Sequence, residues 1–419
     1  MEIDSDKFLL YNTYTNNLFE INKQDYGKLL NIKAGNFTDI EDGLIKELIH
    51  NNILVEDDRI LTQKIKLARL NTRFCSDVMH LTIAPTIACN FACPYCYENN
   101  ISIKKSMNIK VQSDIIKFIE SNKKLRDLHI DWYGGEPLLA FDTIISLTKQ
   151  IQKLHIDNFN AAMVTNGYLL DLTKIKRLKE LNITRIQITI DGLEKTHNER
   201  RPHKTNNNSF KQIIKNLTTL YEVYPEIQAN IRVNIDKKNA SEFFDLNEYL
   251  IKTINNPSLG IYPAYITEFN PCKTTFCMLN RMDQANFVLN NFNKYPFEQL
   301  YYPVTALSEC TARFQNSFVI GVNGEIYKCW CDIGIKDKEI GNIKDGIINT
   351  NLYTQYMSDA DPLYDTKCLE CSYFPVCNGG CVFKRLKKQM GNKIDVCTIQ
   401  KNNINDFMKL YYVKKEANS

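Results

Sequence analysis

Apolar and polar positions follow a repeating order along the middle of the chain. From residue 81 to residue 266, short apolar runs rich in β-branched and aromatic side chains alternate with longer stretches whose apolar residues recur at helical spacing. The short runs predict strands at residues 81–88, 128–133, 161–165, 185–190, 228–235 and 260–266. The longer stretches predict helices, among them residues 111–119, 144–154, 210–220 and 241–251. Six successive strand–helix units predict an α/β fold built on a parallel sheet.

The length of this region indicates which kind of parallel sheet to expect. A closed eight-stranded barrel needs about 250 residues, which is more than the six units span. We therefore predict an open, partial (β/α)6 TIM-like barrel within residues 81–300. In parallel βα folds the active site lies at the carboxyl ends of the strands, so the functional residues are expected there.

The two ends of the chain have patterns of their own. The first eighty residues predict a small α+β module, residues 1–80, from two short strands and two short helices. These elements are expected at residues 8–11, 18–21, 26–30 and 43–49. Such a module could bind an extended peptide by strand addition, or it could only cover one end of the barrel, and the pattern favours neither. After about residue 300 cysteines become frequent, which predicts a loop-rich, metal-dependent domain over residues 301–419.

Composition narrows the class of protein. The chain has 419 residues, of which 44% are hydrophobic and 24% charged, as is ordinary for a globular protein. The net charge of +4 is spread without a basic block, so we expect no nucleic acid as a partner. Apolar runs are too short to cross a membrane, and residues 1–7 lack the basic start and apolar stretch of a signal peptide. We therefore expect a cytoplasmic protein, in which a set of 14 cysteines points to metal binding rather than to disulfides.

A cluster of three cysteines follows the first predicted strand of the barrel. Cys89, Cys93 and Cys96 form a C-x3-C-x2-C pattern, and no fourth cysteine follows nearby. Iron–sulfur clusters are normally held by four thiolates, so three can hold three irons of a four-iron cluster and leave the fourth iron open to a substrate or cofactor. Half of a zinc site and a set of unrelated buried thiols are the alternatives from this loop alone.

Short polar motifs follow several of the other predicted strands. Gly134, Gly135, Glu136 and Pro137 end the second strand, where two glycines allow a ligand to approach the backbone and Glu136 could accept from an ammonium group. Later strand ends and the segment after the fourth strand carry Thr165, Asn166, Thr189, Asp191, Arg200 and Arg232. Read alone, each motif is more often a turn than a binding site. The charge of Arg232 inside a strand pattern requires a partner.

Taken together, these motifs resemble the radical S-adenosylmethionine (radical SAM) superfamily. The resemblance rests on the three cysteines with Tyr95 before the last of them, and on Gly-Gly-Glu-Pro about forty residues later. It implies that the amine and carboxylate of S-adenosyl-L-methionine (SAM) bind the open iron, and that a 5′-deoxyadenosyl radical is produced. It also implies that the cofactor-binding residues are Tyr95, Gly134, Gly135, Glu136, Pro137, Thr165, Asn166, Thr189, Asp191, Arg200 and Arg232.

The later cysteines resemble the SPASM domain of radical SAM enzymes that modify peptides and proteins. The resemblance implies two auxiliary four-iron clusters, and hence three [4Fe-4S] clusters in all. The outer one would be held by Cys368, Cys371, Cys377 and Cys397, and the inner one by Cys310, Cys329 and Cys381. The fourth ligand of the inner cluster stays open among Cys331, Cys272, Cys277 and an open iron. Two zinc ribbons are the alternative, although the C-x5-C and C-x3-C steps suit zinc poorly, and Cys75 is expected to be structural.

These resemblances predict an oxidoreductase that acts on a peptide. The first hypothesis is a maturase that installs a thioether or carbon–carbon cross-link in a ribosomally made precursor peptide, with a low-potential electron donor such as flavodoxin or ferredoxin as its second partner. The alternative is an anaerobic sulfatase-maturating enzyme, which forms formylglycine. The eighty residues before the three-cysteine loop favour the first, as does Trp330 after Cys329, where sulfatase maturases carry an aspartate. A non-catalytic iron–sulfur electron carrier is a third hypothesis, which does not account for Gly-Gly-Glu-Pro.

Overall fold

The chain folds into two compact units that are interleaved along the sequence. The computed structural model describes residues 1–38, 40–96, 98, 105–266, 278–305, 307, 309–377 and 379–417. The first unit comprises Met1–Arg73, Asn280–Cys310 and Asp359–Ser419, and the second comprises Phe74–Leu279 and Thr311–Ser358. Each unit is described by itself below.

The second unit is built on one large sheet. Six parallel strands follow one another in chain order, which confirms the predicted α/β fold with a parallel sheet. They are β3 (Val78–Thr86), β4 (Asp127–Gly134), β5 (Asn158–Thr165), β6 (Ile183–Thr189), β7 (Gln228–Ile235) and β8 (Leu259–Tyr265). Each lies within three residues of the bounds that the hydrophobic pattern predicts.

The sheet continues beyond these six strands into a part of the chain that the pattern placed elsewhere. β9 (Ser317–Ile320) pairs in parallel with β3, and β10 (Glu325–Tyr327), β11 (Gly341–Asn342) and β12 (Gly346–Ile347) follow it as antiparallel strands. The segments 1–80, 81–300 and 301–419 therefore do not coincide with the compact units. A pairing between strands more than two hundred residues apart has no local signature in the sequence.

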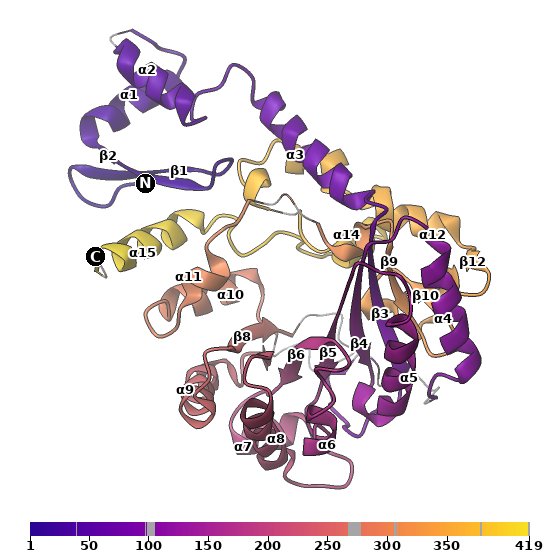
Figure 1. Ribbon diagram of the computed structural model, residues 1–419. Coiled ribbons are helices and arrows are strands. Elements are labelled where there is room, and N and C mark those ends of the chain that lie inside the picture. Colours follow the sequence, from indigo (N-terminus) through magenta and orange to yellow (C-terminus); the bar gives the residue numbers. More distant parts are fainter. Residues whose placement is uncertain are drawn as a thin grey trace. The chain divides into compact units, whose positions relative to one another are not determined.

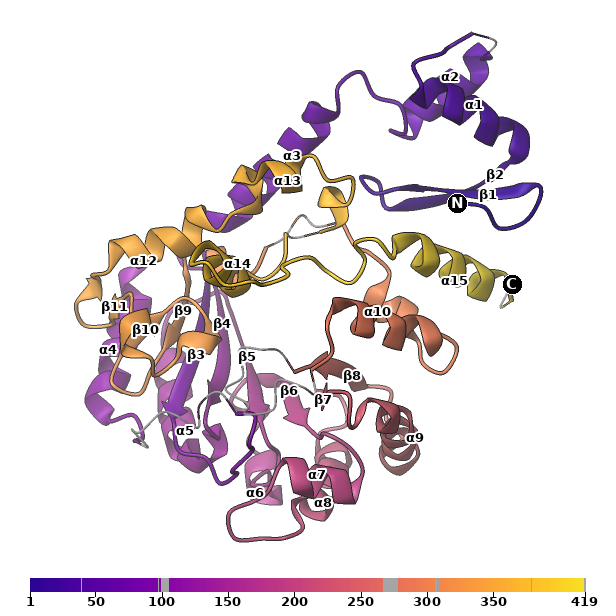
Figure 2. The same ribbon diagram turned by 180° about the vertical axis from the view of Figure 1, so that it is seen from behind.

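Helices cover one side of the parallel strands (Figures 1 and 2). They are α4 (Ile109–Ser121), α5 (Phe141–Ile151), α6 (Leu172–Ile175), α7 (Glu194–Arg200), α8 (Ser209–Val223) and α9 (Phe243–Ile254), with α12 (Thr350–Thr354) later in the unit. β4 shows how the strands divide their side chains: Leu128, Ile130 and Trp132 are fully buried, whereas His129 and Asp131 between them are half-buried. Because side chains alternate across a strand, one face of the sheet is apolar and the other is polar.

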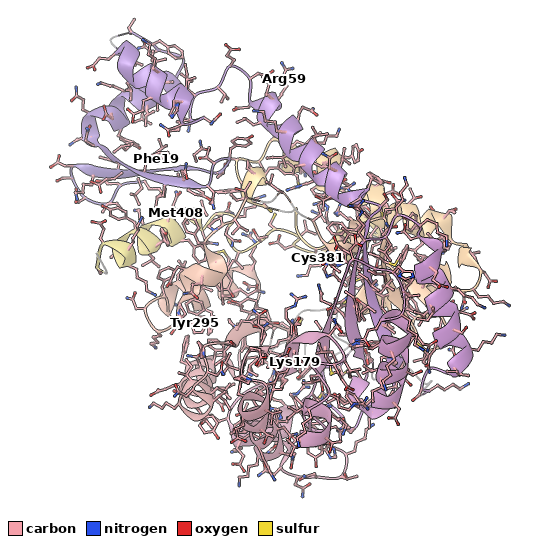
Figure 3. The ribbon with its side chains drawn as sticks, in the orientation of Figure 1. Phe19, Arg59, Lys179, Tyr295, Cys381 and Met408 are labelled. Atoms are coloured by element: carbon pink, nitrogen blue, oxygen red, sulfur yellow. The ribbon has the colours of Figure 1, made fainter. Side chains whose placement is uncertain are left out.

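The first unit combines the amino-terminal module with the carboxyl-terminal cysteines. The predicted hairpin and two helices are present as β1 (Lys7–Asn12), β2 (Asn17–Asn22), α1 (Lys23–Lys33) and α2 (Asp42–His50). The remaining helices are α3 (Asp58–Arg73), α10 (Arg281–Asn290), α11 (Phe297–Tyr301), α13 (Thr366–Leu369), α14 (Val382–Gln389) and α15 (Ile404–Ala417). Met408 of α15 is fully buried in this unit, and Cys381 directly precedes α14 (Figure 3).

Candidate active site

The three-cysteine loop begins directly after β3 and is held by the segment that follows α7. Ala92 donates its main-chain N–H to the carbonyl of Pro202 at 2.9 Å, and Lys204 donates to the carbonyl of Asn90, also at 2.9 Å. Phe91 forms a β-bridge with His203. These bonds fix the backbone between the first two cysteines, so the loop's shape is set by a segment more than one hundred residues away.

Gly134 and Gly135 allow the end of β4 to lie against the start of this loop. A Cβ atom on Gly134 would lie 2.3 Å from the carbonyl oxygen of Thr86, and Gly134 has a φ of +105°. A Cβ atom on Gly135 would lie 2.4 Å from the carbonyl oxygens of Ile87 and Ala88. No side chain fits at either position, so the two glycines are required for the close approach of the two strand ends.

Glu136 joins the ends of β4 and β5 from a fully buried position. Its carboxylate accepts hydrogen bonds from the Thr165 hydroxyl at 2.7 Å and from the main-chain N–H groups of Asn166 at 2.8 Å and Leu138 at 3.0 Å. Burial raises the pKa of Glu136, and these three donors oppose that rise. Pro137 begins a short 3-10 helix (Pro137–Ala140). The carboxylate is thus a structural acceptor, and its direct contact with a ligand stays a prediction.

Tyr95, a residue of the loop, lies at the centre of a buried hydrogen-bond network. Its hydroxyl donates to Asp191 and accepts from Arg201 at 2.6 Å and from the Asn234 amide at 3.4 Å. Asp191 also accepts from the main-chain N–H of Asn234 at 3.1 Å. Tyr95 and Asp191, both predicted as site residues, therefore meet although 96 positions separate them in the chain.

Arg200 and Arg232 have partners of different kinds, carboxylates for Arg200 and an uncharged amide for Arg232. Arg200 pairs with Asp236 at 2.9 Å and lies 3.8 Å from Asp191. Arg232 donates to the amide oxygen of Asn234 at 2.9 Å. Thr189 lies beside Arg232 in the register of β6 and β7. The structure thus brings these residues to neighbouring ends of the strands, whereas their contacts with a bound cofactor stay predictions.

Sequence reasoning missed several members of this site. Arg201 reaches Tyr95, the Asn166 amide donates to Asn90 at 2.8 Å, and Asn239 donates to the carbonyl of Asp191 at 2.7 Å. Arg201 directly follows the predicted site residue Arg200, and this position could have indicated that it also belongs to the site. Asn90 and Asn239 stand in loops where asparagine usually only stabilises a turn, so the sequence offered no signal for them.

The three thiols of the loop suit a metal cluster because each is largely buried. Burial raises the pKa of Cys89 to about 11 and that of Cys96 to about 12, and it also raises the pKa of Cys93. Such thiols stay protonated in water at neutral pH, and a bound metal is what makes buried thiolates stable. The donor set therefore fits a cluster held by Cys89, Cys93 and Cys96.

A second cysteine set lines a cavity in the first unit. The cavity has a volume of about 110 Å³, and Cys368, Cys371, Cys377 and Cys397 all line it. Arg385 donates to the sulfur of Cys368 at 3.6 Å and pairs with Asp365 at 2.6 Å. These four residues are the predicted ligands of the outer auxiliary cluster, and the cavity and the cationic donor fit a cluster of thiolates.

The predicted inner set is divided between the two units. Cys310 and Cys381 belong to the first unit and Cys329 to the second. The thiols of Cys329 and Cys331 hydrogen-bond to each other, which raises the pKa of Cys329 and lowers that of Cys331. The other candidate ligands, Cys272 and Cys277, lie outside the described residues.

Two further observations concern the described parts of the chain. Within these parts, no group of three His, Cys, Asp or Glu side chains is close enough together to bind a single ion, as a mononuclear zinc site requires. A four-iron cluster is larger, and each of its thiolate ligands binds a different iron. None of the helices described has the length and apolar character needed to cross a membrane.

Comparison with known proteins identifies the domain that carries this site. Residues 83–250 match the family model described as the Radical SAM superfamily. This region is a radical SAM domain. The family implies SAM and one four-iron cluster as the cofactors of this domain, in agreement with what the loop and the strand ends predict.

A curated relative and two solved structures are similar to this chain over most of its length. It is 25% identical to a cysteine-type anaerobic sulfatase-maturating enzyme of Clostridium novyi, over 70% of this chain and 84% of that protein. A structure titled native anSMEcpe with bound AdoMet and Cp18Cys peptide has a TM-score of 0.61 at 19% identity and covers 80% of this chain and 97% of that one. Streptococcus suis SuiB bound to precursor peptide SuiA has a TM-score of 0.51 at 17% identity and covers 94% of this chain and 98% of that one. At these identities the two structures establish the fold alone.

Proposed function

We propose that this radical SAM enzyme is a peptide maturase. It abstracts a hydrogen atom from a ribosomally made precursor peptide and installs a thioether or carbon–carbon cross-link, while the second electron passes to an auxiliary cluster and the second hydrogen leaves as a proton. The observation that carries this proposal is the amino-terminal module, which is folded, attached to the cysteine-rich unit and open to a peptide along one strand edge.

The bound cofactors supply the reactivity at the radical site, and the residues of the chain hold those cofactors in position. When bound at Cys89, Cys93 and Cys96, a reduced four-iron cluster and SAM provide a 5′-deoxyadenosyl radical. Polar groups at the carboxyl edge of the sheet then hold the cofactor's ribose, amine and carboxylate. We assign this role to Gly134–Pro137 and to Thr165, Asn166, Thr189 and Arg232. The buried Tyr95–Asp191 contact keeps the loop and the sheet in one arrangement and excludes water.

The module has one strand edge that an extended peptide can pair with. The outer edge of β1 is occupied, because Phe8 forms a bridge with Glu2 and Leu9 donates to the carbonyl of Met1 at 2.7 Å. Within the described residues, no strand pairs with the outer edge of β2. A groove of about 550 Å³ in the same module is lined by apolar side chains that include Ile21, Leu29 and Leu30. An open edge beside apolar pockets is the arrangement that strand addition uses.

The comparisons agree with a peptide substrate. The SuiB structure contains the bound precursor peptide SuiA, and its likeness extends over 94% of this chain, against 80% for anSMEcpe. The likeness to SuiB therefore extends beyond the radical SAM domain and the carboxyl-terminal cysteines. This supports a precursor peptide as the substrate class.

Formylglycine formation in a sulfatase is the competing function, because sulfatase-maturating enzymes are among the relatives of this chain. Trp330 stands where those enzymes carry an aspartate, and its ring lies 4.6 Å from that of Tyr133. The nearest following carboxylate, Asp332, is fully buried and accepts from the Tyr356 hydroxyl. A carboxylate in that position is not placed to take a proton from a substrate, which favours the cross-linking maturase.

The remaining cofactors and partners complete the proposal. Cys368, Cys371, Cys377 and Cys397 hold the outer auxiliary cluster, and Cys310, Cys329 and Cys381 hold the inner one. Cys331, already in contact with Cys329, is the nearest described candidate for its fourth ligand. We further propose that a low-potential carrier such as flavodoxin or ferredoxin delivers the electrons and that the enzyme works in the cytoplasm.

The experiment that tests the function uses the full-length, anaerobically reconstituted protein. It is incubated with SAM, a reductant and either a short peptide encoded beside its gene or a cysteine-containing sulfatase peptide. We expect release of 5′-deoxyadenosine, and loss of the mass of two hydrogen atoms from the first peptide, with fragmentation that locates the cross-link. Formylglycine in the second peptide alone would establish the competing function.

A non-catalytic iron–sulfur carrier is distinguished in the same experiment. Protein with a full complement of iron that released no 5′-deoxyadenosine, and whose cluster spectrum did not change on addition of SAM, would contradict the proposal. Iron counts of Cys331→Ala and Cys272→Ala variants then test the inner cluster, since a ligand's loss lowers iron content and a bystander's does not.

A further inference from the structure

Arg201 is a buried cation whose described side-chain contacts are uncharged. The residue is 9% exposed. One terminal nitrogen donates to the Tyr95 hydroxyl at 2.6 Å, and the guanidinium carbon lies 5.7 Å from the centre of the Phe91 ring. Its Nε has no hydrogen-bond partner within the part of the chain that the structure describes. A buried charge in this condition is costly unless something of opposite charge lies nearby.

The neighbouring carboxylates provide that opposite charge only in part: Asp191 raises the pKa of Arg201, but it reaches the guanidinium through the shared Tyr95 hydroxyl and not in an ion pair. Asp191 already accepts from Tyr95 and Asn234 and lies 3.8 Å from Arg200. Asp236 pairs with Arg200 at 2.9 Å. Among the described residues, no carboxylate forms an ion pair with Arg201, whereas Arg200 beside it interacts with two. The two adjacent arginines therefore have different electrostatic tasks.

The charge of Arg201 acts on the three-cysteine loop. Its guanidinium contacts the loop on both sides of Cys93, with a hydrogen bond to the hydroxyl of Tyr95 and a position over the ring of Phe91. The next residue, Pro202, accepts a main-chain hydrogen bond from Ala92, between the first two cysteines. Arg201 is thus fixed beside the thiolates by its own backbone.

We propose that Arg201 is a positioning residue that supplies the counter-charge of the SAM-binding cluster, stabilising its thiolate ligation and raising its reduction potential. The inference rests on the proposed function in one respect, that the cluster forms at Cys89, Cys93 and Cys96. One electron from the external donor enters the cluster and adds one negative charge to it. A nearby buried cation stabilises that reduced form more than the oxidised form, because the interaction is poorly screened in a dry site.

The test compares Arg201→Met with Arg201→Lys in the reconstituted full-length protein. Redox titration is followed by electron paramagnetic resonance, using the signal that changes when SAM is added, so that the auxiliary clusters do not interfere. In Arg201→Met we expect the ratio of oxidised to reduced cluster at a given potential to rise about tenfold, a shift of about 59 mV to lower potential for one electron. Arg201→Lys retains the charge and should restore most of the wild-type potential.

A control variant separates the effect of a buried charge from that of an exposed one. Lys204→Met removes a charge next to the same loop, where Lys204 donates to the Cys89 carbonyl at 2.5 Å, but from an exposed side chain that water screens. Its shift should be much smaller than that of Arg201→Met.

The outcomes are decisive in each case. An unchanged potential in iron-replete Arg201→Met, or an equal shift in Lys204→Met, would overturn the inference while leaving the proposed function intact. If Arg201→Met binds no iron, Arg201→Lys decides: full iron in the lysine variant supports a need for charge, and equal loss of iron overturns it. Failure of the wild type to release 5′-deoxyadenosine would count against the proposed function instead.

Discussion

Buried polar side chains serve two purposes in the second unit. At the carboxyl ends of the strands, Glu136 and Tyr95 join separate segments of the candidate site through short hydrogen bonds. At the other end of the strands, the rings of His80 and His129 stack with centres 4.7 Å apart, and His129 interacts with the Asn160 amide oxygen at 2.8 Å. The first group shapes the active site, and the second fills the polar face of the sheet.

His80 should make the protein sensitive to acid. Burial, then His129 and Arg185, lower the pKa of His80 from 6.5 to about 4. The folded state thus disfavours the proton that the unfolded chain accepts, so stability is complete above about pH 6.5 and is lost as the pH falls towards about 4. His80→Phe keeps a ring against His129 and Phe314 and removes the titration, so its stability should fall less over this range.

The measurement is the midpoint of urea unfolding at several pH values for both proteins. Acid loss of iron and the titration of the buried His197 affect both proteins alike, so the difference between the two profiles isolates His80. Parallel profiles would show that His80 does not titrate in this way.

Among the helices, α3 has a role that its exposed surface does not suggest. Its last residue, Arg73, is fully buried and pairs with Glu309 at 2.6 Å and with Asp361 at 2.6 Å. Arg69, one turn earlier, donates to the carbonyl of Cys377 at 3.0 Å. A helix from the amino-terminal part of the chain thus holds segments next to the predicted cluster ligands Cys310 and Cys377.

Arg73→Met should strongly destabilise the first unit. It leaves two buried carboxylates without their cation, and breaking a buried pair in this way costs about 3–5 kcal/mol. The check is the temperature of the first unfolding transition. Arg59→Met on the same helix is the control, because Arg59 is exposed and its ion pair is with the nearby Asp57 at 2.7 Å (Figure 3). We expect no measurable change in Arg59→Met, and similar melting of the two variants would contradict the assigned role of Arg73.

Leu30 of α1 should affect peptide binding rather than radical formation. It is 49% exposed and lines the groove of the module. A charge there opposes burial of an apolar peptide side chain, and a loss of about 1.5 kcal/mol corresponds to about a tenfold rise in KM. Leu30→Glu should therefore raise KM for the precursor peptide about tenfold and leave 5′-deoxyadenosine release without peptide unchanged.

The control for this prediction is Ile49→Glu. Ile49 lies on α2, is 55% exposed and does not line the groove. Its KM should match that of the wild type. An equal rise in both variants would indicate a general effect of surface charge and not a peptide-binding groove.

The whole molecule is interleaved in a way that local patterns do not reveal. The hydrophobic periodicity predicts the six strands of the barrel because each run is short, apolar and bounded by polar residues. It does not predict that β9 joins β3, nor that residues before 74 form one compact unit with residues after 358. Such pairings depend on surfaces formed only after the elements have folded, so no window of sequence contains them.

The candidate site shows the same division at the level of side chains. Cys89, Cys93 and Cys96 can be recognised from sequence because thiolates on one cluster must be close in space. On a short loop, residues that are close in space are also close in the sequence. Gly134 and Gly135 can be recognised because a close backbone approach excludes every other side chain. The sequence alone thus determined the chemistry and the order of the parts. Only the tertiary structure decided that Arg201 faces the loop without an ion pair among the described residues while Arg200 has two, because the partners of a buried charge come from distant strands that packing brings together.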